Sequence, residues 1–120
     1  MNEALSALPT DLSHKSISSC EVVLPLAEAL RAIDLLEGAD FHILGWEGWV
    51  KCADGRVGHG SAGKYSSISL HDQTPEEAAR ITRQGIAEDA ASWESENAGT
   101  TDQLYFCITA RAKSNKHVQG

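Results

Sequence analysis

The stretch GHGSAGKY, residues 58–65, has the glycine and lysine spacing of a phosphate-binding loop. In such a loop backbone N–H groups wrap the phosphates, the lysine neutralises them, and a following Ser or Thr holds magnesium. Here the next position is Tyr65, and the residues after it alternate like a strand, so no helix N-terminus is available for the phosphate. We therefore expect no nucleotide site. The glycines are expected to widen the end of a hairpin, and a glycine-rich flap carrying His59 is the alternative.

A second candidate for chemistry is a thiol next to an imidazole that a carboxylate orients, which is the general arrangement of a nucleophile. Cys107, His71 and Glu47 fall on the same face of the expected sheet. However, Cys107 lies in LYFCITA, an ordinary apolar strand pattern, so we expect a buried and inert thiol. The five histidines lack the close spacing that metal ligands use. We expect no catalytic residue, metal or cofactor, and the chain is not expected to be an enzyme.

Length and charge restrict the class of protein. A chain of 120 residues suffices for one domain with one core. The formal net charge of −7 repels phosphate backbones, so a nucleic acid is not the expected partner and a basic protein is. The three cysteines are widely separated and no export signal or membrane-length apolar run occurs, which favours reduced thiols, no membrane partner and a cytoplasmic location.

Polar segments delimit the expected domain. Residues 1–17 contain a proline and scattered Ser, Thr and Asn without sustained periodicity, and we expect a loosely ordered arm there. Residues 18–111 switch repeatedly between periods of two and 3.6, as one α+β domain does. Residues 112–120 are expected to be a flexible tail.

The first half of the domain predicts a strand, a helix and a second strand. Residues 20–24 alternate as a short strand, and Pro25 suits the first turn of a helix that Gly38 ends. Residues 41–52 are extended in pattern, and Asp54-Gly55 supplies the turn of a hairpin.

The second half repeats the order. The return strand is expected over 65–70, followed by a helix from Thr74, whose capping box includes Glu77, to about residue 96. Residues 103–111 are the last strand. The βαββαβ order predicts an antiparallel sheet with both helices on one face, ferredoxin-like, and the other face open. A three-stranded sheet with an irregular first segment is the alternative.

Strand alternation predicts which side chains the open face carries. Leu44, Trp46, Val50 and Cys52 are expected to face the core, as are Ile68, Leu70, Leu104, Phe106 and Ile108. The outward set is expected to be Ile43, Glu47, Trp49, Lys51, Tyr65, Ser67, Ser69, His71, Tyr105, Cys107, Thr109 and Arg111.

Residues 72–102 carry eight acids against two bases, so most of the net negative charge lies on the second helix and its ends. Such a charge run is typical of a solvated helix face, and it is also suited to steering a cationic partner. Aromatic and arginine side chains are enriched at protein interfaces. We therefore expect a small acidic protein-binding module, such as an inhibitor or immunity-type protein that neutralises a basic enzyme like a nuclease toxin. The expected partner-binding residues are Trp49, Tyr65, Tyr105, Glu47, Arg111, Glu88, Glu94 and Glu96.

Two alternatives stay open. One is a small enzyme or ligand-binding domain with a pocket near the glycine-rich loop, and the other is a homodimeric structural module that uses the open sheet face.

Overall fold

The computed structural model describes residues 2–59, 66–67 and 70–113. Its elements are, in chain order, α1 (Glu3–Ala7), α2 (Thr10–Ser13), β1 (Val22–Leu24), α3 (Leu26–Gly38), β2 (Phe41–Lys51), β3 (Val57–His59), β4 (Ser66–Ser67), the 3-10 turn η1 (Leu70–Asp72), α4 (Pro75–Glu96) and β5 (Gln103–Ala112).

The strands form one antiparallel sheet in the order β1-β5-β2-β3, and β4 also pairs with β2. β2 and β5 occupy the centre because they are the long strands, of 11 and 10 residues, and pair from Phe41 opposite Ala112 to Lys51 opposite Gln103. The expected α+β class and antiparallel sheet are confirmed. The exact strand order of a ferredoxin-like sheet is not confirmed.

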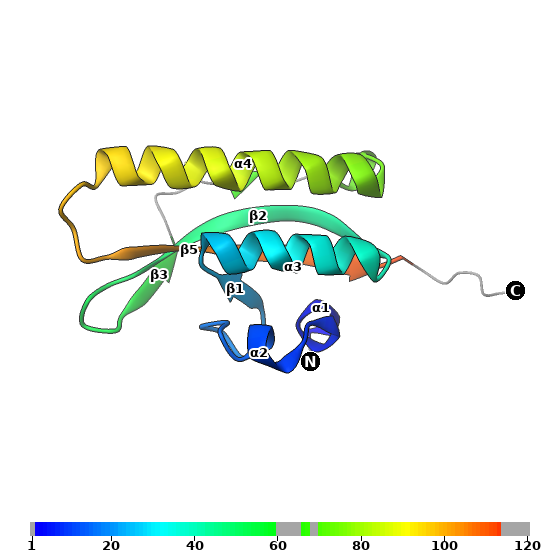
Figure 1. Ribbon diagram of the computed structural model, residues 1–120, viewed down its shortest axis with the longest axis horizontal. Helices are drawn as coiled ribbons and strands as arrows, with labels where there is room; N and C mark the ends of the chain where they lie inside the picture. The colour runs from blue at the N-terminus through cyan, green and yellow to red at the C-terminus, as the bar shows by residue number, and fades with distance from the viewer. Residues whose placement is uncertain (1, 60–65, 68–69, 114–120) are drawn as a thin grey trace, which may run out of the picture.

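The two long helices cover the same face of the sheet, as predicted. Figure 1 shows α3 and α4 running alongside each other next to β2 and β5. Arg83 of α4 ties the pair together, since its guanidinium lies 3.0 Å from a carboxylate oxygen of Asp34 and 3.0 Å from one of Glu37, both on α3. We call the opposite side of the sheet, which carries no helix among the described elements, the outer face.

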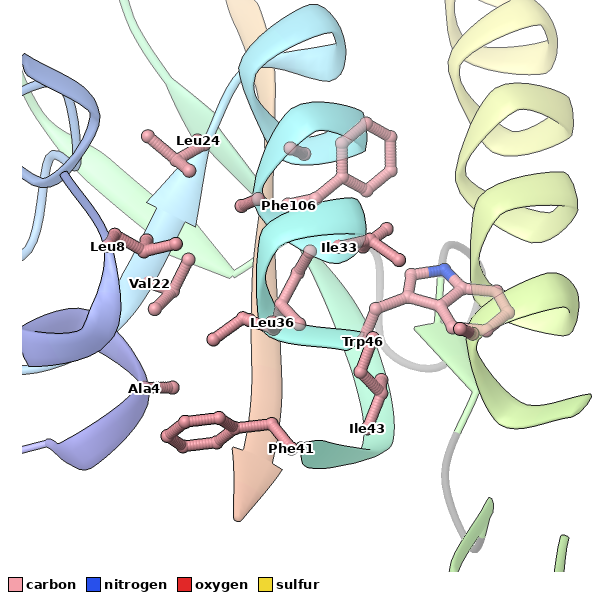
Figure 2. Close-up of a cluster of buried hydrophobic side chains, with 14 of the residues drawn as sticks. Ala4, Leu8, Val22, Leu24, Ile33, Leu36, Phe41, Ile43, Trp46 and Phe106 are labelled. Atoms are coloured by element: carbon pink, nitrogen blue, oxygen red, sulfur yellow. The ribbon is translucent and has the colours of Figure 1, made fainter. Parts of the chain in front are cut away.

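One hydrophobic core lies between the sheet and the helices. Val22, Leu24, Ile43, Phe106 and Ile108 point into it from the strands and are essentially inaccessible to solvent. Figure 2 shows Val22, Leu24, Ile43 and Phe106 gathered around Ile33 and Leu36 of α3, with the indole ring of Trp46 reaching from β2 to α4. The inward prediction for Phe106, Ile108 and Leu70 is confirmed, whereas Ile68 lies outside the described residues.

The N-terminal arm differs from expectation. Instead of a loosely ordered segment, residues 3–13 form α1 and α2, and the apolar side chains Ala4, Leu5, Leu8 and Leu12 are buried in the same core. Figure 2 shows Leu8 beside Val22, and the ring of Phe41 directed toward Ala4. Their burial next to the edge strand β1 explains why so polar a segment is ordered. The other end of the domain, from residue 114, lies outside the described residues.

A β-bulge corrects the predicted alternation of β2. Ile43 pairs with Ala110 and Gly45 with Thr109, which leaves Leu44 as an extra residue without a partner in β5. Such a bulge shifts the side-chain alternation by one residue. Ile43 therefore faces the core and is 1% exposed, so its predicted outward position is wrong, while Leu44 is only half-buried. From Trp46 onward the predicted parity holds.

The predicted helix ends are confirmed in part. The side chain of Thr74 accepts a hydrogen bond from the N–H of Glu77 (3.1 Å), as in a capping box, but the Glu77 carboxylate pairs with Arg80 instead of returning to the cap. Gly38 does not end α3 through a left-handed backbone, because it is still helical. Asp40 takes that conformation, with a φ of 65°.

The predicted hairpin is confirmed at Asp54-Gly55, where Gly55 has a φ of 92° and the N–H of Cys52 donates to the carbonyl of Arg56 (2.8 Å). The return strand expected over 65–70 is confirmed in part. Ser66–Ser67 form β4 within this range, Leu70 lies in η1 instead of a strand, and Val57–His59 form the earlier strand β3, which was not expected.

Candidate functional site

The features that could bind a partner gather at one end of the sheet. β2 ends there and β5 begins, and α4 reaches its C-terminus at the same end (Figure 1). Trp49, Tyr105 and Trp93 come from these three elements. We call this region the aromatic end.

On the outer face, the aromatic end is built around a cross-strand pair. Trp49 of β2 lies directly opposite Tyr105 of β5, and both side chains are half-buried. The indole N–H of Trp49 donates to a carboxylate oxygen of Glu47 (3.2 Å). One step further along, Lys51 lies opposite Val57 of β3, which is 43% exposed. The result is an aromatic and apolar surface that also carries the carboxylate of Glu47 and the ammonium group of Lys51.

On the helix-covered side, the aromatic end contains a hollow of about 250 Å³ between α4, α3 and the start of β5. Trp93 and Glu94 lie on the same helix face as Ala90, one turn earlier, and this face is directed at β5. Phe106 is fully buried at the hollow. Its lining residues are Leu26, Ala90, Trp93, Glu94, Asp102, Gln103, Leu104 and Phe106.

The three predicted acidic residues of α4 are all exposed but do not form one group. Glu94 lines the hollow, and Glu96 is the last residue of the helix. Glu88 lies six residues before Glu94, about 9 Å earlier along the axis, where its carboxylate accepts from the amide of Gln84 (3.1 Å). Only Glu94 and Glu96 therefore belong to the aromatic end.

Two other predicted residues are not brought to this region. Arg111 is exposed near the opposite end of β5, six residues from Tyr105 and thus roughly 20 Å away along the strand. Tyr65 lies outside the described residues, as do the other residues 60–64 of the glycine-rich stretch. The prediction that a strand follows this stretch is confirmed by β4, while a flap and a pocket beside it stay predictions.

The thiol of Cys107 is buried, which confirms that prediction. It lies on the sheet face opposite the core, and burial raises its pKa to about 12, with the nearby carboxylates of Glu21 and Glu47 acting in the same direction. Because the thiolate is the nucleophile, a thiol with so high a pKa is unreactive at neutral pH. Glu47 thus disfavours the thiolate that a catalytic arrangement would need.

The imidazole proposed for that arrangement lies elsewhere. His71 is exposed in η1, 3.5 Å from Asp72. Its neighbour Leu70 offers its carbonyl oxygen to the Nε2 atom of His42 (3.0 Å), near the far end of β2. The His71 side chain therefore does not join Cys107. Within the described ranges, no three His, Cys, Asp or Glu side chains are arranged to hold a metal ion.

Sequence reasoning missed a polar contact inside the helix layer. The indole N–H of Trp46 donates to a carboxylate oxygen of Asp89 on α4 (2.8 Å). Burial raises the pKa of Asp89, the hydrogen bond from Trp46 partly opposes that shift, and the charge of Glu88 adds to it. This contact fixes the position of α4 over β2.

The hollow was also missed, although a signal for it was present. The apolar stripe of α4 continues through Ala90 to Trp93 in the last turns, while the facing strand begins only at Gln103 with an acid immediately before it.

No family model, curated protein or solved structure matches this chain. Over the part of the chain that the structure describes, no helix has the length and apolar character needed to cross a membrane.

Proposed function

We propose that the chain is a small acidic protein-binding module whose partner is a basic protein. The most concrete form of the proposal is an inhibitor or immunity-type protein that neutralises a basic enzyme such as a nuclease toxin. The partner contacts the aromatic end, with Trp49 and Tyr105 as anchors on the outer face and with Glu94 and Glu96 of α4 on the helix-covered side of the same end.

The observation that carries this proposal is the cross-strand pair of Trp49 and Tyr105 on a sheet face that no described helix covers. Tryptophan and tyrosine provide large apolar area with a polar tip and dominate the energetics of many interfaces. The exposed side chain of Val57 extends the same surface onto β3.

The distribution of ion pairs supports a basic partner. Most described bases already have a carboxylate within 4 Å: Lys15 with Glu28, Arg31 with Asp11, Arg56 with Asp54, Arg80 with Glu77, Arg83 with Asp34 and Glu37, and Lys113 with Asp40. Glu94 and Asp102, at the aromatic end, form no ion pair with any residue that the structure describes. Glu94 and Asp102 therefore have no compensating base among the described residues, and with the net charge of −7 they would speed association with a cationic surface.

The test is affinity capture with the tagged chain from its native cell, followed by calorimetry with the purified partner. We expect a protein with a basic surface that binds one to one. Trp49→Ala should weaken binding by roughly 30-fold, because an aromatic anchor contributes about 2 kcal/mol or more. Reversal of Glu88, Glu94 and Glu96 to lysine should slow association, mainly at low salt.

Leu35→Ala is the matched control, since Leu35 is an exposed apolar residue on α3, away from the aromatic end. It should leave the dissociation constant unchanged. If the Trp49 and charge-reversal variants retained every partner that the wild type captures, the proposed surfaces would be wrong.

A further inference from the structure

We propose that the hollow between α4 and β5 is a socket for one arginine side chain of the partner. This inference rests on the proposed function, because it names the chemistry by which a basic partner is recognised. We call the hollow, with the lining given above, the arginine socket.

The size of the hollow favours a single side chain over a cofactor. Pockets for drug-sized ligands span roughly 300–1,000 Å³, and the volume here is about 250 Å³. The lining is apolar at depth, with Phe106 fully buried and Leu104, Leu26 and Ala90 partly buried around it. Such a lining suits the aliphatic stem of a long side chain.

The two charged residues of the lining favour a cation. Glu94 stands on the α4 side and Asp102 on the β5 side, and neither carboxylate has a positively charged neighbour within the described residues. A guanidinium presents several N–H donors in a planar fork, so one arginine can contact two carboxylates that approach from different sides.

Trp93 favours arginine over lysine. Its half-buried side chain lines the hollow together with the two acids. A guanidinium is planar and weakly hydrated and stacks on an indole face, whereas an ammonium is a compact and strongly hydrated charge. The indole N–H of Trp46 is bonded to Asp89, but that of Trp93 donates to no residue in the described part of the chain and stays available to the partner backbone.

The experiment titrates short peptides into the ¹⁵N-labelled full chain and follows backbone amides and indole N–H signals. The probes are acetyl-Gly-Arg-Gly-amide and the same peptide with citrulline, an uncharged analogue of nearly the same shape, or with lysine. We expect saturable shifts for the arginine peptide at Trp93, Glu94 and 102–106, with a dissociation constant on the order of millimolar. The citrulline peptide should bind at least about tenfold more weakly, and the lysine peptide several-fold more weakly.

Variants locate the effect. Glu94→Gln and Asp102→Asn should each weaken arginine binding by roughly tenfold, and Trp93→Leu should remove the preference for arginine over lysine. Glu76→Gln removes one negative charge from the exposed first turn of α4, far from the hollow, and should change nothing. The unchanged amide spectrum of each variant outside the hollow checks its folding.

Equal shifts with the citrulline peptide, shifts away from 93–94 and 102–106, or full binding by Glu94→Gln/Asp102→Asn would overturn the socket. Because the titration uses no partner, these outcomes leave the partner test with Trp49→Ala unaffected. Failure of that test would conversely leave a socket that binds arginine.

Discussion

At Gly85 the packing of the helix layer leaves no room for a side chain. A Cβ at this position would overlap with the Cη2 and Cζ2 atoms of Trp46. The indole ring lies against the helix backbone there, and its N–H reaches Asp89 one turn later. The absence of a side chain at residue 85 is therefore what lets α4 lie close to β2.

Gly85→Ala should lower the free energy of unfolding by about 1–3 kcal/mol, because the methyl group must displace the Trp46 ring. The result is diagnostic because Gly to Ala in a helix interior otherwise stabilises by up to about 1 kcal/mol. Gly38→Ala in α3 is the control: no atom lies within 4 Å of its Cβ, so the substitution should be neutral or stabilising. Urea unfolding followed by circular dichroism measures both, and a Gly85→Ala variant as stable as the wild type would contradict the close contact.

At the residue scale, the sequence predicted side-chain direction well wherever alternation was uninterrupted. Trp49, Tyr105 and Cys107 lie on the face expected of them. Ile43 does not, because a bulge is a two-to-one pairing between strands and leaves no local mark in the sequence of one strand. The Trp46 contact with Asp89 likewise depends on how far α4 lies from β2, which periodicity does not encode.

The N-terminal helices show how an element can be ordered by packing alone. α1 and α2 have five and four residues, too short to be stable in isolation. The apolar residues Ala4, Leu5, Leu8 and Leu12 are spaced so that a continuous helix would carry them on one side. This weak apolar stripe was the available signal in the sequence. It was outweighed by Pro9 and by the polar residues around it, and the contact of α1 with β5 joins two segments near opposite ends of the sequence, which no local pattern encodes.

Leu12→Ala should therefore destabilise the whole domain by about 2–5 kcal/mol, the usual cost of emptying a buried leucine site. Leu12 is 1% exposed, whereas a residue in a loosely ordered arm would cost nothing on truncation. Ser6→Ala, on the exposed side of α1, serves as the control and should change stability by less than about 0.5 kcal/mol. Equal midpoints of urea unfolding for both variants would show that the arm does not support the core.

The long elements were the predictable ones. α3, α4 and β5 lie within two residues of their expected bounds, because each has a sustained period and recognisable ends. The strand order was harder to predict from the sequence. β1 and β3 have only three residues each, and the central position of β5 follows from its long pairing with β2, which no local pattern encodes. The hollow depends on that order, since it requires β5 to begin next to the end of α4 and the start of α3.

For the whole molecule, the negative charge favours binding of a different protein over self-association through the outer face. Two copies meeting at the aromatic end would bring the acidic ends of α4 together, and like charges oppose such a contact. We expect the chain to sediment as a monomer from micromolar to millimolar concentration at low salt. A dimer that Trp49→Ala dissociates would replace the basic partner by a second copy of this chain.

The three tryptophans lie at three different places in the fold, so their fluorescence can report on three different events. Trp46 is buried at the contact of β2 with α4, Trp49 lies on the outer face, and Trp93 lines the hollow. In three variants that each keep one tryptophan and carry phenylalanine at the other two positions, the emission of a single indole follows a single event. Trp46 would report whether α4 is docked on the sheet, Trp49 whether a partner covers the outer face, and Trp93 whether a cation has entered the hollow. Fluorescence could thus separate folding, docking and charge recognition without any added label.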